Sequence, residues 1–197
     1  MEYPMEIKQK KLSNLHTFTF SDNHFNFAFK DNSGSDDFDL NYADFPDKSS
    51  ISIEQNEWLR NVGVVWCLLG CYRIGTAIYS DLSLSGTAFW LFIGLICLVW
   101  FAFTKVKYSV YKTEQGRIFI INDKKHDEII SEIKERKKAQ LLKWYGEINL
   151  ENELEDEVHK FNWLAKQNVI SQQEADEKIA QVELAYKNDS NQQTFLN

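Results

Sequence analysis

Residues 61–80 read NVGVVWCLLGCYRIGTAIYS and residues 86–104 read GTAFWLFIGLICLVWFAFT, and these two apolar stretches decide the fold. At about 1.5 Å per residue, helices of roughly 18 to 20 residues match a bilayer core about 30 Å thick. The second stretch carries no charged residue, and the first carries only Arg73. We therefore predict a transmembrane helical hairpin over residues 58–104. The alternative is a pair of buried core helices.

The link between the two stretches sets their direction. Only residues 81–85 separate them, so the helices must be antiparallel, with both ends of the hairpin on one side. Arg60 precedes the first stretch and Lys105 and Lys107 follow the second, whereas the link has no positive charge. The positive-inside rule then predicts that both termini are cytoplasmic. Because a long polar segment precedes the hairpin, we do not interpret it as a signal peptide.

Two features inside the hairpin need an explanation. Arg73 lies near the middle of the first stretch, where an arginine costs about 2.5–3.5 kcal/mol on insertion scales. It either marks a functional polar site or extends its long side chain toward the outer interface. Gly63, Cys67, Cys71 and Gly75 recur every four residues, and such small residues let helices pack closely. We expect this stripe to pack against the second helix or to mediate self-association of hairpins.

The sequence contains no motif that is typical of an enzyme active site. No Gly-rich phosphate loop, HExxH or GxSxG pattern occurs. All three cysteines (Cys67, Cys71 and Cys97) lie in the apolar stretches, which excludes a secreted disulfide framework and gives no metal-ligand motif. We expect no catalytic residues, no metal and no cofactor. A net charge of −7 also argues against nucleic acid as a partner.

Alternating apolar residues predict strands on both sides of the hairpin, and a helical pattern follows them. The expected strands span residues 16–20, 24–30, 38–42, 106–112 and 117–122, and the helix spans residues 126–145. Since both ends of the hairpin face one compartment, we predict a single cytoplasmic β-domain split into residues 15–57 and 105–146. An N-terminal tail would occupy residues 1–14.

This order of antiparallel strands and a C-terminal helix resembles the small PH-like domains of bacterial membrane proteins, some of which carry a transmembrane hairpin between strands. The resemblance spans residues 15–145. A complete PH-like barrel would have two strands more than the pattern above predicts. PH-like folds in this setting bind lipids or proteins, but a fold alone transfers neither role. The resemblance implies a bacterial inner membrane location.

Charge is segregated after the hairpin. Residues 105–145 hold 11 Lys+Arg and 6 Asp+Glu, whereas residues 146–197 hold 4 and 11. A basic segment beside the membrane gains roughly 1 kcal/mol for each residue that reaches an anionic headgroup. The densest group is the candidate leaflet contact: Lys134, Arg136, Lys137 and Lys138. The alternative is an ordinary solvated helix face.

A helical hairpin is predicted over residues 147–187, with a disordered tail at residues 188–197. Ser171 and Glu174 form a capping box that opens its second helix. The pattern resembles the short C-terminal helical module called SHOCT, in residues Phe161, Leu164, Val169, Ile170 and Ile179. That family usually has Gly where Asn168 stands and an aromatic residue where Ala175 stands. The resemblance implies an interaction or oligomerisation module; an unrelated helical hairpin would give a similar pattern.

The predicted fold class is therefore an α+β membrane protein. A transmembrane helical hairpin is inserted in a small antiparallel β-domain with a C-terminal helix, and a helical hairpin follows. The predicted function is a non-enzymatic, membrane-anchored scaffold or regulatory protein that presents a cytoplasmic interaction domain. The alternative is a membrane-active effector or immunity component whose transmembrane hairpin oligomerises. The expected partners are the lipid bilayer and either another protein or further copies of the chain.

Overall fold

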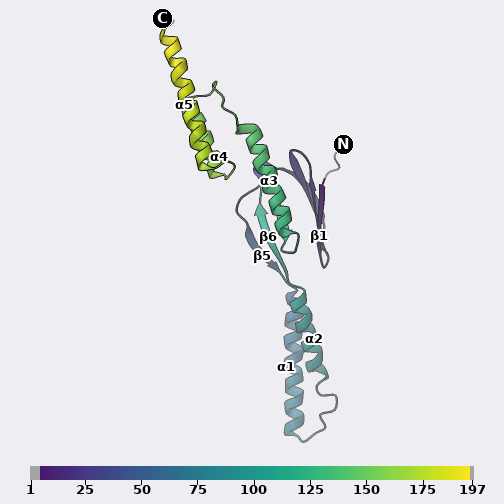
Figure 1. The fold of residues 1–197 in the computed structure, drawn as a ribbon. Helices are drawn as coiled ribbons and strands as arrows, with labels where there is room; N and C mark the ends of the chain where they lie inside the picture. The colour runs from purple at the N-terminus through teal and green to yellow at the C-terminus, as the bar shows by residue number, and fades with distance from the viewer. Residues whose placement is uncertain (1–4, 196–197) are drawn as a thin grey trace.

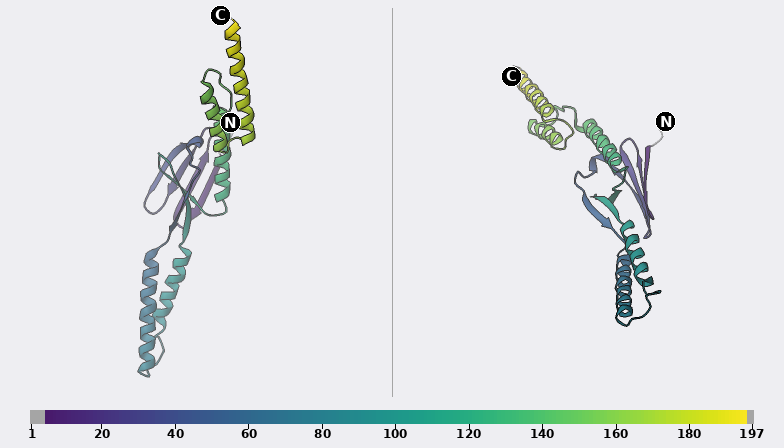
Figure 2. Two further views of the ribbon diagram at one scale, coloured as in Figure 1. Left: turned by 90° about the vertical axis from the view of Figure 1, so that its left-hand side faces the viewer. Right: turned by 60° about the horizontal axis from the view of Figure 1, so that its bottom comes forward.

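The computed structural model describes the backbone of residues 5–195 and the side chains of residues 5–187. Within this part the chain is α+β, with two antiparallel sheets and five α-helices. The molecule is elongated: the sheets lie in the middle, a pair of apolar helices extends from one end, and the C-terminal helices lie at the other (Figure 1). A second viewing direction shows the same three-part arrangement (Figure 2).

The first sheet is a four-stranded meander. Its strands are β1 (Met5–Lys11), β2 (Asn14–Phe20), β3 (His24–Lys30) and β4 (Ser35–Asn41), hydrogen-bonded in the order β1-β2-β3-β4. The register pairs Phe18 with Phe27 and Phe27 with Phe38, so aromatic rings from neighbouring strands pack against each other in tilted and edge-to-face contacts. A short 3₁₀ turn, η1 (Tyr42–Asp44), ends this half of the domain.

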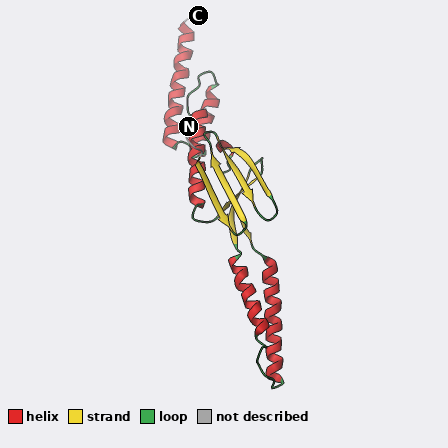
Figure 3. Cartoon of the chain, turned by 90° about the vertical axis from the view of Figure 1, so that its right-hand side faces the viewer, coloured by secondary structure: helices red, strands yellow, loops and turns green. Residues whose placement is uncertain are grey.

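The second sheet joins segments from both sides of the apolar hairpin. β5 (Ser50–Glu54) precedes the hairpin, and β6 (Val106–Lys112) and β7 (Arg117–Ile121) follow it, in the order β5-β6-β7. Ser50 pairs with Val110 and Glu54 pairs with Val106. The β-segments before and after the hairpin therefore form one structure, and Figure 3 shows the two sheets side by side.

A single large apolar core unites both sheets and the following helix α3 (His126–Tyr145). Phe18 and Phe27 of the first sheet, Ile118 and Ile120 of β7, and Ile133 of α3 are all completely buried in it. Gln9 links the sheets: its amide donates to the Ile121 carbonyl at 2.7 Å and accepts from the Ile121 N–H at 2.9 Å. This pair of bonds replaces the strand pairing that is missing between β1 and β7.

The apolar hairpin consists of α1 (Glu57–Tyr79) and α2 (Phe89–Phe103). The second apolar stretch is thus less helical than predicted, since 86–88 form a turn with Gly86 at a φ of 78°. At 1.5 Å per residue its 15 residues span about 22 Å, less than a bilayer core. The 23 residues of α1 are long and apolar enough to cross a membrane.

Two segments differ from the sequence prediction at the ends of the chain. β1 occupies half of residues 1–14, which were expected to be a tail, because Gln9 and the ladder to β2 fix it. The C-terminal hairpin contains α4 (Leu154–Lys166) and α5 (Gln172–Phe195). α5 continues through most of the segment expected to be disordered, and residues 196–197 lie outside the described part.

Candidate functional site

The surface of the apolar hairpin is the most unusual feature of the structure. Only 17% of the apolar window of α1 is buried, whereas a core helix of a soluble protein would be mostly buried. The two helices pack on each other and on little else, so their outer faces are exposed (Figure 1). Exposed apolar area on this scale marks a surface that another apolar phase or molecule covers.

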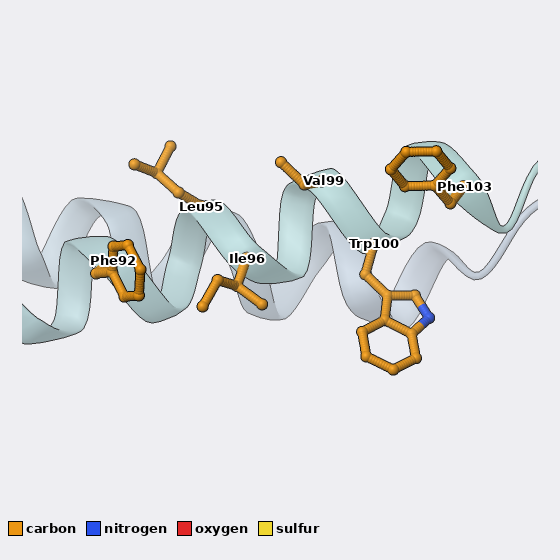
Figure 4. Close-up of a pocket in the computed structure, with 6 residues that line it drawn as sticks. All are labelled: Phe92, Leu95, Ile96, Val99, Trp100 and Phe103. Carbon is orange, nitrogen blue, oxygen red and sulfur yellow. The ribbon is translucent and has the colours of Figure 1, made fainter.

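The outer face of α2 carries an apolar groove. Six side chains line it, all from α2, and they spread along the helix from end to end (Figure 4). They are Phe92, Leu95, Ile96, Val99, Trp100 and Phe103. Each is 47–76% exposed, and no polar side chain interrupts the groove. A groove without polar groups cannot orient a substrate through hydrogen bonds, but it can accommodate lipid tails or an apolar helix.

The predicted small-residue stripe is half right. Gly63 and Cys67 do face α2: a Cβ placed on Gly94 would lie 2.6 Å from the Cys67 amide nitrogen and 2.8 Å from the Gly63 carbonyl oxygen. The other two members point elsewhere, since Cys71 is exposed and a Cβ on Gly75 would meet nothing within 4 Å. The four-residue stripe therefore leaves the interface after one turn.

A seven-residue repeat describes the interface better. The buried residues of α1 are Gly63, Gly70 and Ala77. A Cβ on Gly70 would lie 2.4 Å from the Leu91 amide nitrogen, so α1 and α2 touch through their backbones there. A seven-residue spacing is the geometry of left-handed helix pairs, whereas a four-residue stripe winds around the helix. Gly70 was not among the predicted packing residues, although it lies seven residues from both Gly63 and Ala77.

An aromatic pair fixes the rotation of the two helices. The rings of Trp66 and Trp90 stack with their centroids 4.3 Å apart and their planes within 7°. Both indoles lie beside the glycine contacts, and stacked rings add about 0.5–1.5 kcal/mol to burial alone. Small residues thus allow the close approach, and the indole pair selects one angular arrangement.

Arg73 lies on the exposed side of α1. Its side chain makes no ion pair or hydrogen bond with any residue that the structure describes, and Asp81 does not reach it. Its carbonyl accepts a hydrogen bond from the Thr76 hydroxyl at 3.0 Å. Both interpretations of Arg73, a polar site and extension toward the interface, stay open.

The predicted leaflet contact divides into two kinds of residue. Lys137 is 8% exposed and donates to the Phe45 carbonyl at 2.8 Å and to Asp47 at 2.9 Å. Arg136 donates to Glu132 at 2.6 Å, and its guanidinium lies over the ring of Phe20. These two cations are used inside the domain, and their assignment to lipid stays a prediction. 

Only Lys134 and Lys138 of the four are exposed. They line a groove with residues 167–169 of the turn between α4 and α5. This groove lies along the middle of α3, beside the turn between α4 and α5. The two lysines therefore face the C-terminal module and not the base of the hairpin.

The residues predicted as an interaction module form the core of that module. Phe161 and Leu164 are completely buried, and Val169 and Ile170 are 2% and 8% exposed. Ile179 packs at the edge of the same cluster, which also includes Leu141 of α3. Since Phe161, Leu164, Val169 and Ile170 are buried and Ile179 is partly buried, these residues stabilise the helical hairpin.

The turn between α4 and α5 follows the expected capping pattern. Ser171 and Glu174 exchange hydrogen bonds of 2.7 and 3.1 Å, as in a capping box. Asn168 has a φ of 57°, and the Val169 N–H donates to the Leu164 carbonyl at 2.9 Å. Asparagine tolerates this left-handed conformation, which explains why it can stand where the SHOCT pattern has glycine.

A buried charge lies next to this core. Glu157 is completely buried and accepts from Lys160 at 2.6 Å, from Asn152 at 2.7 Å and from the Asn149 N–H at 3.2 Å. Burial by itself raises the pKa of Glu157, but the hydrogen bonds outweigh it and hold the pKa below its usual range. The sequence does not indicate that Glu157 is buried, because acidic residues in the first turn of a helix are usually exposed to solvent.

The histidines and acidic residues do not assemble a metal centre in the described residues. His126 is held by the Ser109 hydroxyl at 2.8 Å and by Asp127 at 2.8 Å, so both of its ring nitrogens have protein partners. Comparison with known proteins adds no assignment: no protein-family model, no curated protein and no solved structure matches the chain.

Proposed function

We propose that the chain is a non-enzymatic scaffold or regulatory protein, anchored in a bacterial inner membrane by the α1–α2 hairpin. The observation that carries this proposal is the exposed apolar surface of two helices that extend from one end of the molecule. Both termini of the hairpin join the β-domain, so that domain lies on one side of the membrane. The positive-inside rule makes this side the cytoplasm.

The arrangement of the β-domain supports a PH-like fold. β1 and β5 add two strands to those predicted from alternation, which gives a four-stranded and a three-stranded sheet followed by α3. This is the number that the resemblance requires. On this proposal the domain is a rigid platform at the membrane surface, and the α4–α5 module recruits a protein partner or a second copy.

Site-directed labelling tests the anchor. In native membranes, a Ser83→Cys variant, made in a background with the three native cysteines replaced by alanine, should react with a membrane-impermeant maleimide added from outside. A Ser33→Cys variant in the same background should react only after the membrane is opened. Reaction of both from outside, or recovery of the chain in the soluble fraction, would refute the anchor.

Truncation tests the role of the C-terminal module. A chain lacking residues 151–186 should still insert but should lose its partner or form a smaller oligomer in detergent. Unchanged size and unchanged partners would remove the support for a scaffold. The neighbouring reading frames and a pull-down from native membranes would identify the partner.

A membrane-active effector is the second candidate, and one observation favours it. Gly75 and exposed Cys71 leave a small-residue face of α1 without a partner in the described structure. A second hairpin packed there would build an assembly, and Arg73, two residues from each, would lie on the opposite side of α1. Arg73→Leu should then change ion leakage on overexpression, whereas a scaffold should be indifferent to it.

A further inference from the structure

A small cavity lies between the two sheets, where β2 and β3 face β5 and β6. Its volume is about 140 Å³. Aromatic rings form part of the wall, namely Phe29, Phe119 and Tyr108, and polar side chains form the rest, including His16, Asp31 and Glu54. None of these residues belongs to the apolar hairpin or to the α4–α5 module.

His16 has an unsatisfied nitrogen in this wall. The residue is 4% exposed, and its Nδ1 has no hydrogen-bond partner among the described residues. Burial lowers the pKa of His16, so the ring is neutral near pH 7. A neutral imidazole has one acceptor nitrogen, and with the ring proton on Nε2 the unpartnered Nδ1 is that acceptor. An unpaired buried polar atom costs about 1–3 kcal/mol.

The two carboxylates at the mouth of the cavity, exposed Glu54 and half-buried Asp31, also have acceptor atoms without a protein partner. Oε2 of Glu54 accepts from Tyr108 at 2.8 Å and from Asn14 at 3.2 Å, but Oε1 has no partner in the described residues. Oδ1 of Asp31 accepts from the Ser33 and Gly34 amides at 2.7 and 3.0 Å, while Oδ2 accepts nothing there. Neither carboxylate forms an ion pair within the described chain.

The cavity is therefore rich in acceptors and poor in free donors. The amide of Asn14 and the hydroxyl of Tyr108 already donate inside the wall. A ligand that satisfies His16, Glu54 and Asp31 together must carry several N–H groups and a positive charge. Aromatic faces also attract cations. A divalent metal is disfavoured because the described residues hold no group of three metal ligands.

We propose that this cavity binds a primary ammonium group, through His16, Glu54 and Asp31 as acceptors and the surrounding rings as a cation-binding wall. Glu54 is the last residue of β5 and α1 begins at Glu57, so the cavity lies at the base of the apolar hairpin. The ammonium can therefore come from a soluble amine or from a lipid headgroup. The first source does not depend on the membrane anchor proposed above.

Titration of the full chain tests this site. The protein is placed in phosphatidylcholine nanodiscs, and methylammonium and ethanolammonium are added while the ring resonances of His16 are followed by NMR. Both amines should shift the His16 signals with saturation, and tetramethylammonium, which has no N–H group, should not. Replacing part of the lipid by phosphatidylethanolamine separates the two sources, because a headgroup that enters the cavity shifts His16 without added amine.

Matched variants make the result specific. Glu54→Gln keeps the acceptor for Tyr108 but removes the charge, and it should weaken methylammonium binding at least tenfold. Asp31→Asn should also weaken it, whereas Glu114→Gln, an exposed carboxylate in the β6–β7 turn, should leave it unchanged. No shift with any amine or with phosphatidylethanolamine would overturn the proposal, and so would equal binding of tetramethylammonium or equal affinity in Glu54→Gln.

Discussion

Two glycines on the same helix allow a direct test of how α1 and α2 pack. Gly70 touches the backbone of α2, since a Cβ added to it would lie 2.4 Å from the Leu91 nitrogen and 2.7 Å from the Leu91 Cα. Gly75 lies five residues further along and has nothing within 4 Å of the same added atom. Replacing each by alanine changes the chain by one methyl group in the same helix. The two variants differ only in what that methyl group meets.

The expected difference follows from the contact distances. Non-bonded heavy atoms prefer about 3.5–4.0 Å, so Gly70→Ala forces the helices about 1 Å apart, and backbone atoms cannot rotate out of the way. Overpacking of this kind costs about 1–3 kcal/mol. Both variants gain the roughly 1 kcal/mol by which alanine favours a helix over glycine. Gly70→Ala should therefore be about 1–3 kcal/mol less stable than Gly75→Ala.

The stacked indoles of Trp66 and Trp90 provide the signal. Their coupled transitions should give a pair of bands of opposite sign in circular dichroism, and a Trp66→Phe variant identifies these bands. The full chain is unfolded in mixed micelles with increasing denaturing detergent while the bands are followed. Gly70→Ala should lose them early, and Gly75→Ala should lose them at or above the wild-type midpoint. Equal midpoints for the two variants would refute the backbone contact at Gly70.

Three further changes probe the parts outside the apolar hairpin by thermal unfolding of the full chain. Lys137→Met leaves a buried carbonyl unpaired and should cost about 1–3 kcal/mol, whereas Lys138→Met should stay within about 0.5 kcal/mol; equal effects would contradict the buried position of Lys137. Gln9→Leu removes both bonds to Ile121 and should cost about 2 kcal/mol, and a wild-type melting curve would refute that link between the sheets. Because the folded pKa of Glu157 is lowered, its ionised form stabilises the α4–α5 module above about pH 4.5, and that stability should fall as the pH drops through the folded pKa. Glu157→Gln should lack this dependence; a parallel loss in both proteins would show that another group is responsible.

The strands that the sequence predicted bury a large apolar residue at every second position over much of their length. Phe25 and Phe27 alternate with polar residues, and burial of every second ring makes the period visible. The sequence did not predict β1, because the side chains that it buries are Ile7 and Gln9, and a polar glutamine gives no hydrophobic signal. Gln9 is buried for its hydrogen bonds and not for its hydrophobicity, so only the folded sheet explains it.

The sequence also failed to predict β5, whose apolar side chains are exposed. Ile51 and Ile53 alternate with serines, yet their side chains are 65% and 53% exposed. The strand forms through its backbone bonds to β6, and its partner lies across the whole apolar hairpin in the sequence. Local periodicity carries no information about a partner that distant. The same limit applies to the cavity, whose wall combines residues as far apart as His16 and Phe119.

The candidate leaflet contact shows that a run of basic residues in the sequence does not indicate which of them are exposed. Four basic residues in five positions look alike in the sequence, but positions on a helix differ by 100° per residue, so a run of cations cannot share one face. Lys137 turns toward Asp47 and the core, while Lys138 turns toward the C-terminal module. Which of the four is buried depends on where α3 lies on the sheets, and this requires the tertiary structure.

The pairing of β5 with β6 also explains why the hairpin needs glycine. Paired strands are about 4.8 Å apart, whereas packed helices with ordinary side chains are 8–10 Å apart. Only two residues separate each strand from its helix, since β5 ends at Glu54 before α1, and α2 ends at Phe103 before β6. The first turn of α1 and the last turn of α2 must therefore stay close together. Gly63 and Gly94 continue that close approach further along the helices: a Cβ on Gly63, six residues into α1, would lie 3.1 Å from the carbonyl oxygen of Gly94, nine residues before the end of α2.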